Sequence, residues 1–170
     1  MTYNVHSCVG KDRKASPERI AAVIAEFDPD IVALQELDFR LMRSGLADQA
    51  EMIAAHLNMC CHFHPSITLE EGHYGNAVLC KHPMALIKTC ELPTLPGRRD
   101  IEKRGALWVE VSMSDRKLHV INTHLGLNGR ERRVQTELLL GSDWIGNPSR
   151  TAPLIFCADL NALPISRVYR

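Results

Sequence analysis

Five short segments of this sequence place polar side chains beside apolar, strand-like runs. The side chains are a single Glu, several Asn, an Asp and a His, which are types that bind hard divalent cations and phosphate oxygens. Because chemistry in α/β sheets is usually placed at strand ends, they indicate a metal-dependent hydrolase of phosphate esters. No histidine follows His124, so no second imidazole comes after the last segment. The segments are Thr2-Tyr3-Asn4, Gln35-Glu36, Gly75-Asn76-Ala77, Asn122-Thr123-His124-Leu125 and Ala158-Asp159-Leu160-Asn161-Ala162.

Glu36 and Asn4 are the candidate metal ligands. Glu36 follows an apolar run, 31–34 plus Gln35, that reads as a buried strand. A carboxylate there needs water, a cation or a partner, because an unpaired buried charge is costly. Glu36 is therefore either a ligand of a cation such as Mg²⁺ or a solvated strand-end residue. Asn4 is either a turn former or a side chain that offers its carbonyl oxygen to a metal or its amide to a phosphate.

His124, Asp159 and Asn161 are the candidate catalytic residues. His124 is either a structural histidine bonded to a backbone carbonyl, or a general acid or electrostatic stabiliser of the transition state. Asp159 and Asn161 lie two residues apart, so both side chains face one way from an extended backbone. Asp159 would hold a metal or a nucleophilic water, and Asn161 a phosphate. The alternative for this pair is an Asx turn after a strand.

Other polar residues carry weaker signals. Arg104 is either a solvated charge at a strand start or a cation that meets a phosphate oxygen. His62 and His64 share one face of a predicted strand at a spacing that can bind a transition metal, but no third ligand is evident nearby. The sequence contains no P-loop, no GxGxxG motif and no nucleophile elbow. A basic cluster after the His124 run is typical of a solvated helix face and comprises Arg130, Arg132 and Arg133.

The elements that must position these residues alternate between helices and strands. Ser16 can cap a first helix and Pro17 fits its first turn. A second helix is predicted over 47–57 and a third after the loop 126–129. The first helix ends at Asp28-Pro29-Asp30 and carries an apolar stripe of Ile20, Val23, Ile24 and Phe27; the stripe of the third comprises Val134, Leu138 and Ile145.

Strands are interleaved with these helices, which indicates an α/β or mixed α+β fold. The runs 77–80 and 85–87 are expected to pair around a turn at 81–83. The segment 66–74 reads as a loop, and 92–104 as an exposed loop near a functional edge. The remaining predicted strands are 31–34, a short strand around 61–63, 107–111, 118–121 and 154–157. No internal linker or second domain is predicted.

Length and composition are those of one globular domain with a sizeable core. The chain has 170 residues, no net charge and a pI near 7.1, which argues against a broad basic surface for long nucleic acid. Its six cysteines include no CxxC pair, which favours buried reduced thiols in a cytoplasmic protein. The sequence shows no signal-peptide pattern and no apolar run long enough to span a membrane.

In combination and in this order, the motifs resemble those of the endonuclease/exonuclease/phosphatase superfamily, the DNase I-like hydrolases. The resemblance rests on Gln35-Glu36, on Asn122 to Leu125 and on Asp159 to Ala162, and it covers nearly the whole chain. The opening residues, Thr2 to Cys8, are similar to those of small bacterial metal-dependent hydrolases. The resemblance implies a four-layer α/β sandwich of two mixed sheets flanked by helices. It also implies hydrolysis of a phosphate ester by in-line attack of water, assisted by Mg²⁺ or Mn²⁺.

Roles for individual residues follow from the same resemblance. Glu36 would bind the metal, with Asn4 beside it. His124 matches the phosphate-binding or acid histidine of the family. Asp159 and Asn161 match the pair that positions the nucleophile and the scissile phosphate. Arg104 and Asn76 match a substrate-facing arginine and a motif near the site.

The sequence departs from the family pattern after Asn161. Family members carry further strands, an Asp and a closing Ser-Asp-His whose histidine is the general base. The Ser-Asp pair of this chain, Ser142-Asp143, is followed by Trp144 instead. We therefore expect a single domain over 1–170 that is incomplete at its C-terminal end. An open sheet edge there would favour self-association, and loss of the general base would cost about 10²–10⁴-fold in rate.

Two functions remain open at this point. The first is a cytoplasmic, metal-dependent hydrolase of phosphate esters, of phosphodiesterase or nuclease type. Its substrate would be a small phosphodiester, a lipid head group or nucleic acid, and the neutral net charge favours a smaller phosphodiester. The alternative is a catalytically inactive metal- or phosphate-binding fragment that is completed by, or assembles with, another chain.

Overall fold

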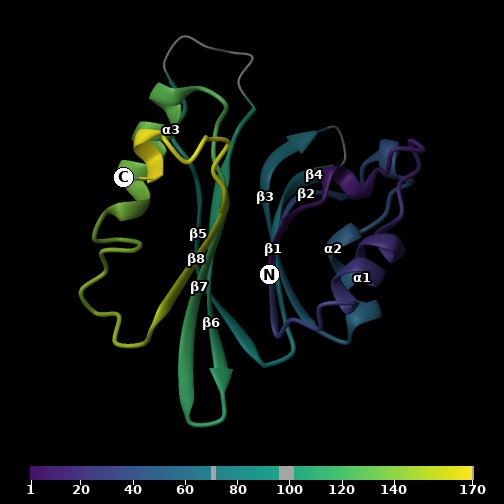
Figure 1. The fold of residues 1–170 in the computed structure, drawn as a ribbon, viewed down its shortest axis with the longest axis horizontal. Coiled ribbons are helices and arrows are strands. Elements are labelled where there is room, and N and C mark those ends of the chain that lie inside the picture. The colour runs from purple at the N-terminus through teal and green to yellow at the C-terminus, as the bar shows by residue number, and fades with distance from the viewer. Residues whose placement is uncertain (70–71, 96–101, 170) are drawn as a thin grey trace.

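Two four-stranded β-sheets stack face to face in the computed structural model, with helices on both outer faces (Figure 1). The structure describes residues 1–69, 72–95 and 102–169. One sheet has the order β1-β2-β4-β3 and the other β5-β6-β7-β8. Each contains one parallel pair, β1 with β2 and β7 with β8, so both sheets are mixed as predicted. The helices α1 and α2 cover the first sheet, and α3 covers the second.

The bounds of the elements are as follows. The first sheet contains β1 (Thr2–Asn4), β2 (Ile31–Phe39), β3 (Cys60–Leu69) and β4 (Gly72–Cys80), with α1 (Pro17–Ala25) and α2 (Gln49–Leu57). The second contains β5 (Met84–Glu91), β6 (Gly105–Met113), β7 (Arg116–His124) and β8 (Leu154–Asp159), with α3 (Gly129–Leu140). Three short 3₁₀ turns are η1 (His6–Cys8), η2 (Met42–Ser44) and η3 (Arg167–Tyr169). None of the described helices is long and apolar enough to cross a membrane.

The start of α1 is confirmed, but its predicted apolar stripe is partly wrong. The Ser16 hydroxyl accepts a hydrogen bond from the Arg19 N–H, and Pro17 occupies the first turn. The helix ends at Ala25, and Phe27, beyond that end, is 68% exposed. The buried residues are Pro17, Ala21 and Ile24. The face of α1 that packs on the sheet therefore differs from the predicted face. It includes the small residues Pro17 and Ala21, which allow close packing.

The strand that carries Glu36 continues beyond it, contrary to the predicted end near position 34. Leu34 pairs with Ala77, but Leu37 pairs with Gly75, so Gln35 and Glu36 together face the single residue Asn76. This is a β-bulge, in which one extra residue re-aims the side chains around it. It lets both Leu34 and Leu37 pack against the helices.

The β3–β4 hairpin corrects two further predictions. The segment 66–74 is not a loop, because β3 and β4 run through most of it. Gly75 sits where a Cβ atom would come within 2.0 Å of the His64 carbonyl oxygen, so only glycine permits this close approach. The strands β4 and β5 do not pair with each other around residues 81–83; they belong to different sheets. Short apolar runs do not show which partner a strand takes, and here the chain crosses between layers.

The predicted apolar side of the third helix is also wrong. The buried face of α3 is Glu131, Gln135 and Leu139, spaced four apart, whereas Leu138 is 37% exposed. Gln135 accepts a hydrogen bond from the Gly126 N–H and donates to the Pro93 carbonyl. The buried Gln135 side chain thus connects the helix to the loops that contain Gly126 and Pro93. Ile145, which was predicted to belong to the apolar stripe, lies beyond the end of the helix at Leu140.

The segment 92–104 is only partly described, because residues 96–101 lie outside the described part. Its two flanks, Leu92 and Arg104, are buried rather than exposed. The six cysteines are free thiols; Cys8 and Cys80 are buried, but Cys60 is exposed.

The core has three layers, and one amide joins the two sheets across the middle layer. Asn122, fully buried on β7, donates to the carbonyl oxygens of Leu34 and Ala77, both at 2.8 Å. Its own side-chain oxygen accepts from the amide of Gln35 at 2.7 Å. Around it the sheets meet through apolar side chains of β4, β6 and β7. Asn122 therefore fixes the position of one sheet relative to the other.

Replacing Asn122 by alanine should destabilise the protein by about 2–4 kcal/mol, because two buried carbonyls lose a donor and the Gln35 amide loses its acceptor at 2.7 Å. Urea unfolding followed by far-ultraviolet circular dichroism would measure the change. Asn147→Ala is the matched control, since it removes a single local turn hydrogen bond to Ser149 and should cost less than about 1 kcal/mol. Equal effects of the two substitutions would contradict the role given to Asn122.

Candidate active site

The candidate residues meet at one edge of the sandwich, where four strands from both sheets come together. Asn4 ends β1, and Glu36 stands on the bulge of β2. His124 ends β7, Asp159 ends β8, and Asn161 follows two residues later with a left-handed backbone, φ 46°. The parallel pairing of β1 with β2 and of β7 with β8 brings the carboxyl ends of these strands together.

Asn4 connects the two carboxylates across the sheets. Its amide nitrogen donates to Glu36 Oε1 at 2.8 Å and to Asp159 Oδ2 at 2.9 Å. Its side-chain oxygen accepts from the His6 N–H at 3.1 Å, which fixes the orientation of the amide. Glu36 and Asp159 are thereby held on either side of one nitrogen atom, although they are far apart in sequence.

Both carboxyl groups are held in the ionised form. Burial raises the pKa of Glu36, but hydrogen bonds from Asn4 and His6 outweigh it and lower the pKa below its usual value. Burial likewise raises the pKa of Asp159, and hydrogen bonds from Asn4 and the Asn161 N–H more than offset the effect. Among the described residues, neither carboxylate forms an ion pair with Lys or Arg. Two adjacent negative charges thus lack a cationic side chain of their own.

His124 receives two hydrogen-bond donors. Arg104 Nη1 lies 3.1 Å from its Nδ1, and the Asn161 amide nitrogen lies 2.7 Å from its Nε2. Burial and the adjacent Arg104 lower the pKa of His124 to about 4, so the imidazole is neutral at pH 7. A neutral imidazole accepts at only one nitrogen, and the two donors therefore compete for it. At His124 two donors thus face one acceptor, although Asn161 also donates to the Leu125 carbonyl at 2.8 Å and Arg104 to Glu102 at 3.1 Å.

Arg104 and Asn76 occupy different environments. Arg104 is buried, is paired with Glu102 at 3.0 Å, and has an Nε with no hydrogen-bond partner among the described residues. Asn76 is also buried, and its amide donates to the Gly105 carbonyl at 3.1 Å. In the structure Asn76 therefore supports the backbone next to Arg104, and a contact of its own with substrate stays a prediction.

Two residues at the site had no recognisable role in the sequence. His6 Nδ1 lies 3.1 Å from Glu36 Oε2, in a turn where His6, Ser7 and Cys8 all have positive φ angles. Such conformations cost about 1 kcal/mol or more for each non-glycine residue. Tyr74, on β4, pairs with Asp38, two residues along β2 from Glu36, and burial together with the nearby Glu36 carboxylate raises the pKa of its hydroxyl.

The donor set fits a hard divalent cation of the Mg²⁺ type. Such cations take one or two carboxylates, with water and substrate oxygens as the other ligands, and Glu36 and Asp159 provide two ionised carboxylates. In the described part of the chain no group of three or more His, Cys, Asp or Glu residues is arranged to bind a metal. This argues against a dedicated protein cage. The zinc hypothesis also loses support, because the rings of His62 and His64 contact the backbone carbonyls of Met84 and Cys90.

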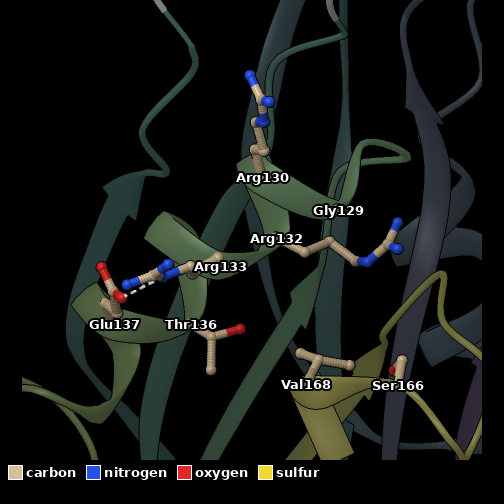
Figure 2. A pocket seen from close by; sticks show the side chains of 8 residues that line it. All are labelled: Gly129, Arg130, Arg132, Arg133, Thr136, Glu137, Ser166 and Val168. Atoms are coloured by element: carbon tan, nitrogen blue, oxygen red, sulfur yellow. Dashed lines mark hydrogen bonds and ion pairs between the residues drawn. The ribbon is translucent and has the colours of Figure 1, made fainter.

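The basic cluster at the start of α3 does not form a shared anion site. Figure 2 shows Arg130, Arg132 and Arg133 pointing in three directions around a pocket of about 530 Å³. Arg133 pairs with Glu137 at 2.8 Å, and Arg132 donates to the carbonyls of Gly126 and Leu127. A smaller cavity of about 260 Å³ is lined by Asn4, Asp159 and Asn161, among others. The candidate chemistry is therefore at the second cavity.

The sequence of the whole chain matches a known family. The model of the endonuclease/exonuclease/phosphatase family matches residues 1–170. The chain belongs to this family, whose members are hydrolases acting on phosphate esters. The predicted resemblance is thus confirmed.

Solved structures support the DNase I-like fold. An endonuclease/exonuclease/phosphatase protein from Beutenbergia cavernae has a TM-score of 0.71 at 22% identity, covering 98% of this chain and 49% of its own. The human Nocturnin catalytic domain, solved with a bound sulfate anion, has a TM-score of 0.69 at 22% identity; the match covers 98% of this chain and 65% of the Nocturnin chain. The uncharacterized Escherichia coli protein YbhP is 32% identical over 93 residues, which are 54% of this chain and 34% of YbhP. The matched part is thus about half of the Beutenbergia chain and a third of YbhP.

The low pKa of His124 predicts a loss of stability in mild acid. An unfolded histidine titrates near 6.5, whereas His124 in the folded protein titrates near 4. The unfolded chain binds the proton first, so stability contributed by neutral His124 is present above about pH 6.5 and is lost as the pH falls toward 4. His124→Gln should remove about 2 kcal/mol of that pH dependence.

Urea unfolding at pH 7.5, 5.5 and 4.5 in EDTA measures this dependence. His56→Gln, at an exposed position on α2, is the control and should keep the wild-type slope. If His124→Gln also kept it, His124 would not be the group that titrates.

Proposed function

We propose that this chain is a divalent-metal-dependent hydrolase of phosphate esters, of phosphodiesterase or nuclease type. The observation that supports this most directly is the division of the site into two parts. Glu36 and Asp159 form an ionised acidic part, while Arg104, Asn161 and His124 form a part with excess hydrogen-bond donors. A cation would fit the first part and phosphate oxygens the second.

In the proposed mechanism each residue has a task that follows from its contacts. Glu36 would hold the Mg²⁺ or Mn²⁺ ion, with Asn4 fixing the orientation of the carboxylate. The bound ion would stabilise negative charge that develops on phosphate oxygens. Arg104 and Asn161 would donate to those oxygens, and neutral His124 would donate an N–H without transferring its proton. Asp159 would orient the attacking water.

The substrate class follows from the neutral net charge of the chain. We propose a small phosphodiester in preference to a lipid head group or long nucleic acid, because a neutral net charge argues against a broad basic surface that could hold a polyanion. A cytoplasmic location is part of the proposal; it is supported by the absence of CxxC cysteine pairs in the sequence.

Hydrolysis of bis(p-nitrophenyl) phosphate with Mg²⁺ or Mn²⁺ tests the proposal. EDTA should abolish turnover, and Glu36→Gln should lower it at least about 100-fold, because the cation loses its charged ligand. Glu26→Gln, at an exposed position after α1, should retain wild-type activity. Turnover that persisted in EDTA, or that Glu36→Gln left intact, would exclude the proposed chemistry.

The alternative function is a catalytically inactive binding fragment that assembles with another chain. It is favoured by β8, which forms an edge of the second sheet and leaves Ile155 and Phe156 45% and 38% exposed. Exposed apolar edge strands are templates for pairing with a further strand. Such pairing would produce a homo-oligomer or a complex with a completing chain.

Sedimentation velocity over a range of concentrations tests this alternative. Self-association through β8 should be weakened at least about tenfold by Phe156→Lys, because charges on an edge strand oppose pairing. Phe27→Lys introduces the same charge at another exposed phenylalanine, after α1, and should have no effect. A monomer at all concentrations would rule out the homo-oligomer.

A further inference from the structure

Two residues beyond Glu36 on the same strand, a buried carboxylate, Asp38, forms an ion pair with the partly exposed Arg43. The Asp38 side chain is completely buried, and its two carboxylate oxygens accept from Arg43 Nη2 at 2.6 Å and Nε at 2.9 Å. A buried carboxylate is costly unless it is paired and hydrogen-bonded. The bidentate geometry also fixes the plane of the guanidinium group.

Two other elements hold this ion pair in place. Ser7 in η1 donates its hydroxyl to Asp38 Oδ1 at 3.1 Å. Gln49 at the start of α2 accepts from the Asp38 N–H at 2.9 Å and donates to the Ser7 carbonyl at 2.7 Å. Because every group in this network is constrained by at least one other, Arg43 has little freedom relative to β2.

The free face of Arg43 covers Tyr74. The guanidinium carbon lies 5.4 Å from the centre of the tyrosine ring, within the range of a cation–π contact. Tyr74 stands directly opposite Asp38 in the β2–β4 ladder, so strand pairing and the arginine restrict the same ring. Glu36 lies two residues before Asp38 on β2, which places its carboxylate beside this ring, and the carboxylate adds to burial in raising the pKa of the Tyr74 hydroxyl.

We propose that Arg43 and Tyr74 are positioning residues that hold the Glu36 carboxylate in the orientation needed to bind a divalent cation. The inference rests on the proposed function, because it assigns a purpose to contacts around the proposed metal ligand. Outer residues that orient a metal ligand typically contribute 10–100-fold to metal affinity. Glu36 needs such support because its backbone is left-handed, φ 64°, at the bulge.

A purely structural role for this network makes a different prediction. If Asp38 and Arg43 served only to stabilise the bulge, the Tyr74 hydroxyl would be dispensable for metal binding. If they act through Tyr74, removal of that single oxygen should weaken the metal while the ring keeps its packing. Tyr74→Phe separates the two cases.

Isothermal titration of the intact chain with Mn²⁺ is the measurement. Tyr74→Phe should raise the Kd about tenfold without changing the circular dichroism spectrum. Tyr3→Phe is the matched control, because its ring packs in the helix-facing core, and it should leave the Kd within about twofold. A Tyr74→Phe protein that binds Mn²⁺ as the wild type does would overturn the inference.

Arg43→Lys provides a second, independent variant. Lysine keeps a positive charge for Asp38 but loses the flat, bidentate group that covers Tyr74, so the Kd should again rise several-fold. Arg19→Lys is the control, since Arg19 makes a similar bidentate pair with Asp12 away from the site. Because Arg43 acts through Tyr74, the double variant should bind Mn²⁺ no more weakly than Tyr74→Phe alone. Fully additive effects would contradict this order of action.

The failure of the inference and that of the proposed function give different results. Wild-type protein that shows no Mn²⁺ binding, or binding that Glu36→Gln leaves unchanged, would refute the metal site itself. Binding that depends on Glu36 but not on Tyr74 or Arg43 would refute only the positioning role.

Discussion

The two halves of the site stay together because two buried amides join the sheets. Gln35 and Asn122 meet at 2.7 Å between the sheets, and Asn122 also holds a carbonyl of β2 and one of β4. Gln35 immediately precedes Glu36, and Asn122 lies two residues before His124. A shift of one sheet against the other would leave several buried polar groups without partners, which costs far more than sliding apolar surfaces would. The polar contact therefore sets the register in which Asn4 can reach both Glu36 and Asp159.

Five of the eleven non-glycine residues with positive φ angles in the described part of the chain lie at the same edge of the molecule. Glu36, Asn161 and the turn His6–Cys8 all have positive φ angles without being glycine. Each costs free energy and persists only where surrounding contacts fix it. In the turn those contacts are the hydrogen bonds of Ser7 with Asp38 and of Gln49 with Ser7, whereas Glu36 is held by Asn4 and Asn161 by its bonds to Asp159 and Leu125. The arrangement is consistent with a site whose side chains are oriented before any ligand arrives.

Much of the fold and most of the site residues could be predicted from the sequence, and the failures have physical causes. The Ser16 cap and the apolar runs of β2, β7 and β8 act locally, so their positions could be read directly. The bulge at Glu36 arises in the pairing of β2 with β4 around Asn76, a contact that only the folded chain creates. The face of α3 was misjudged because two polar residues, Glu131 and Gln135, are buried there, and Gln135 accepts a hydrogen bond from the Gly126 N–H. Tyr74 and Arg43 join the site through strand pairing and a cation–π contact, which leave no pattern along the chain.

The charge distribution of the site is suited to the two ligands of opposite sign that the proposed function requires. At neutral pH Glu36 and Asp159 are ionised, and His124, with a pKa of about 4, carries no charge. Arg104 shares its positive charge with Glu102, so the carboxylates beside Asn4 are left with a net negative field. A divalent cation would neutralise that field and in turn attract a phosphate group. The phosphate oxygens would then supply further acceptors for Arg104 and Asn161, which compete for one imidazole nitrogen. In this view the carboxylates of the protein alone leave an excess of negative charge at the site. A bound cation would offset that charge, which otherwise repels the phosphate, so that binding of the cation favours binding of the phosphate.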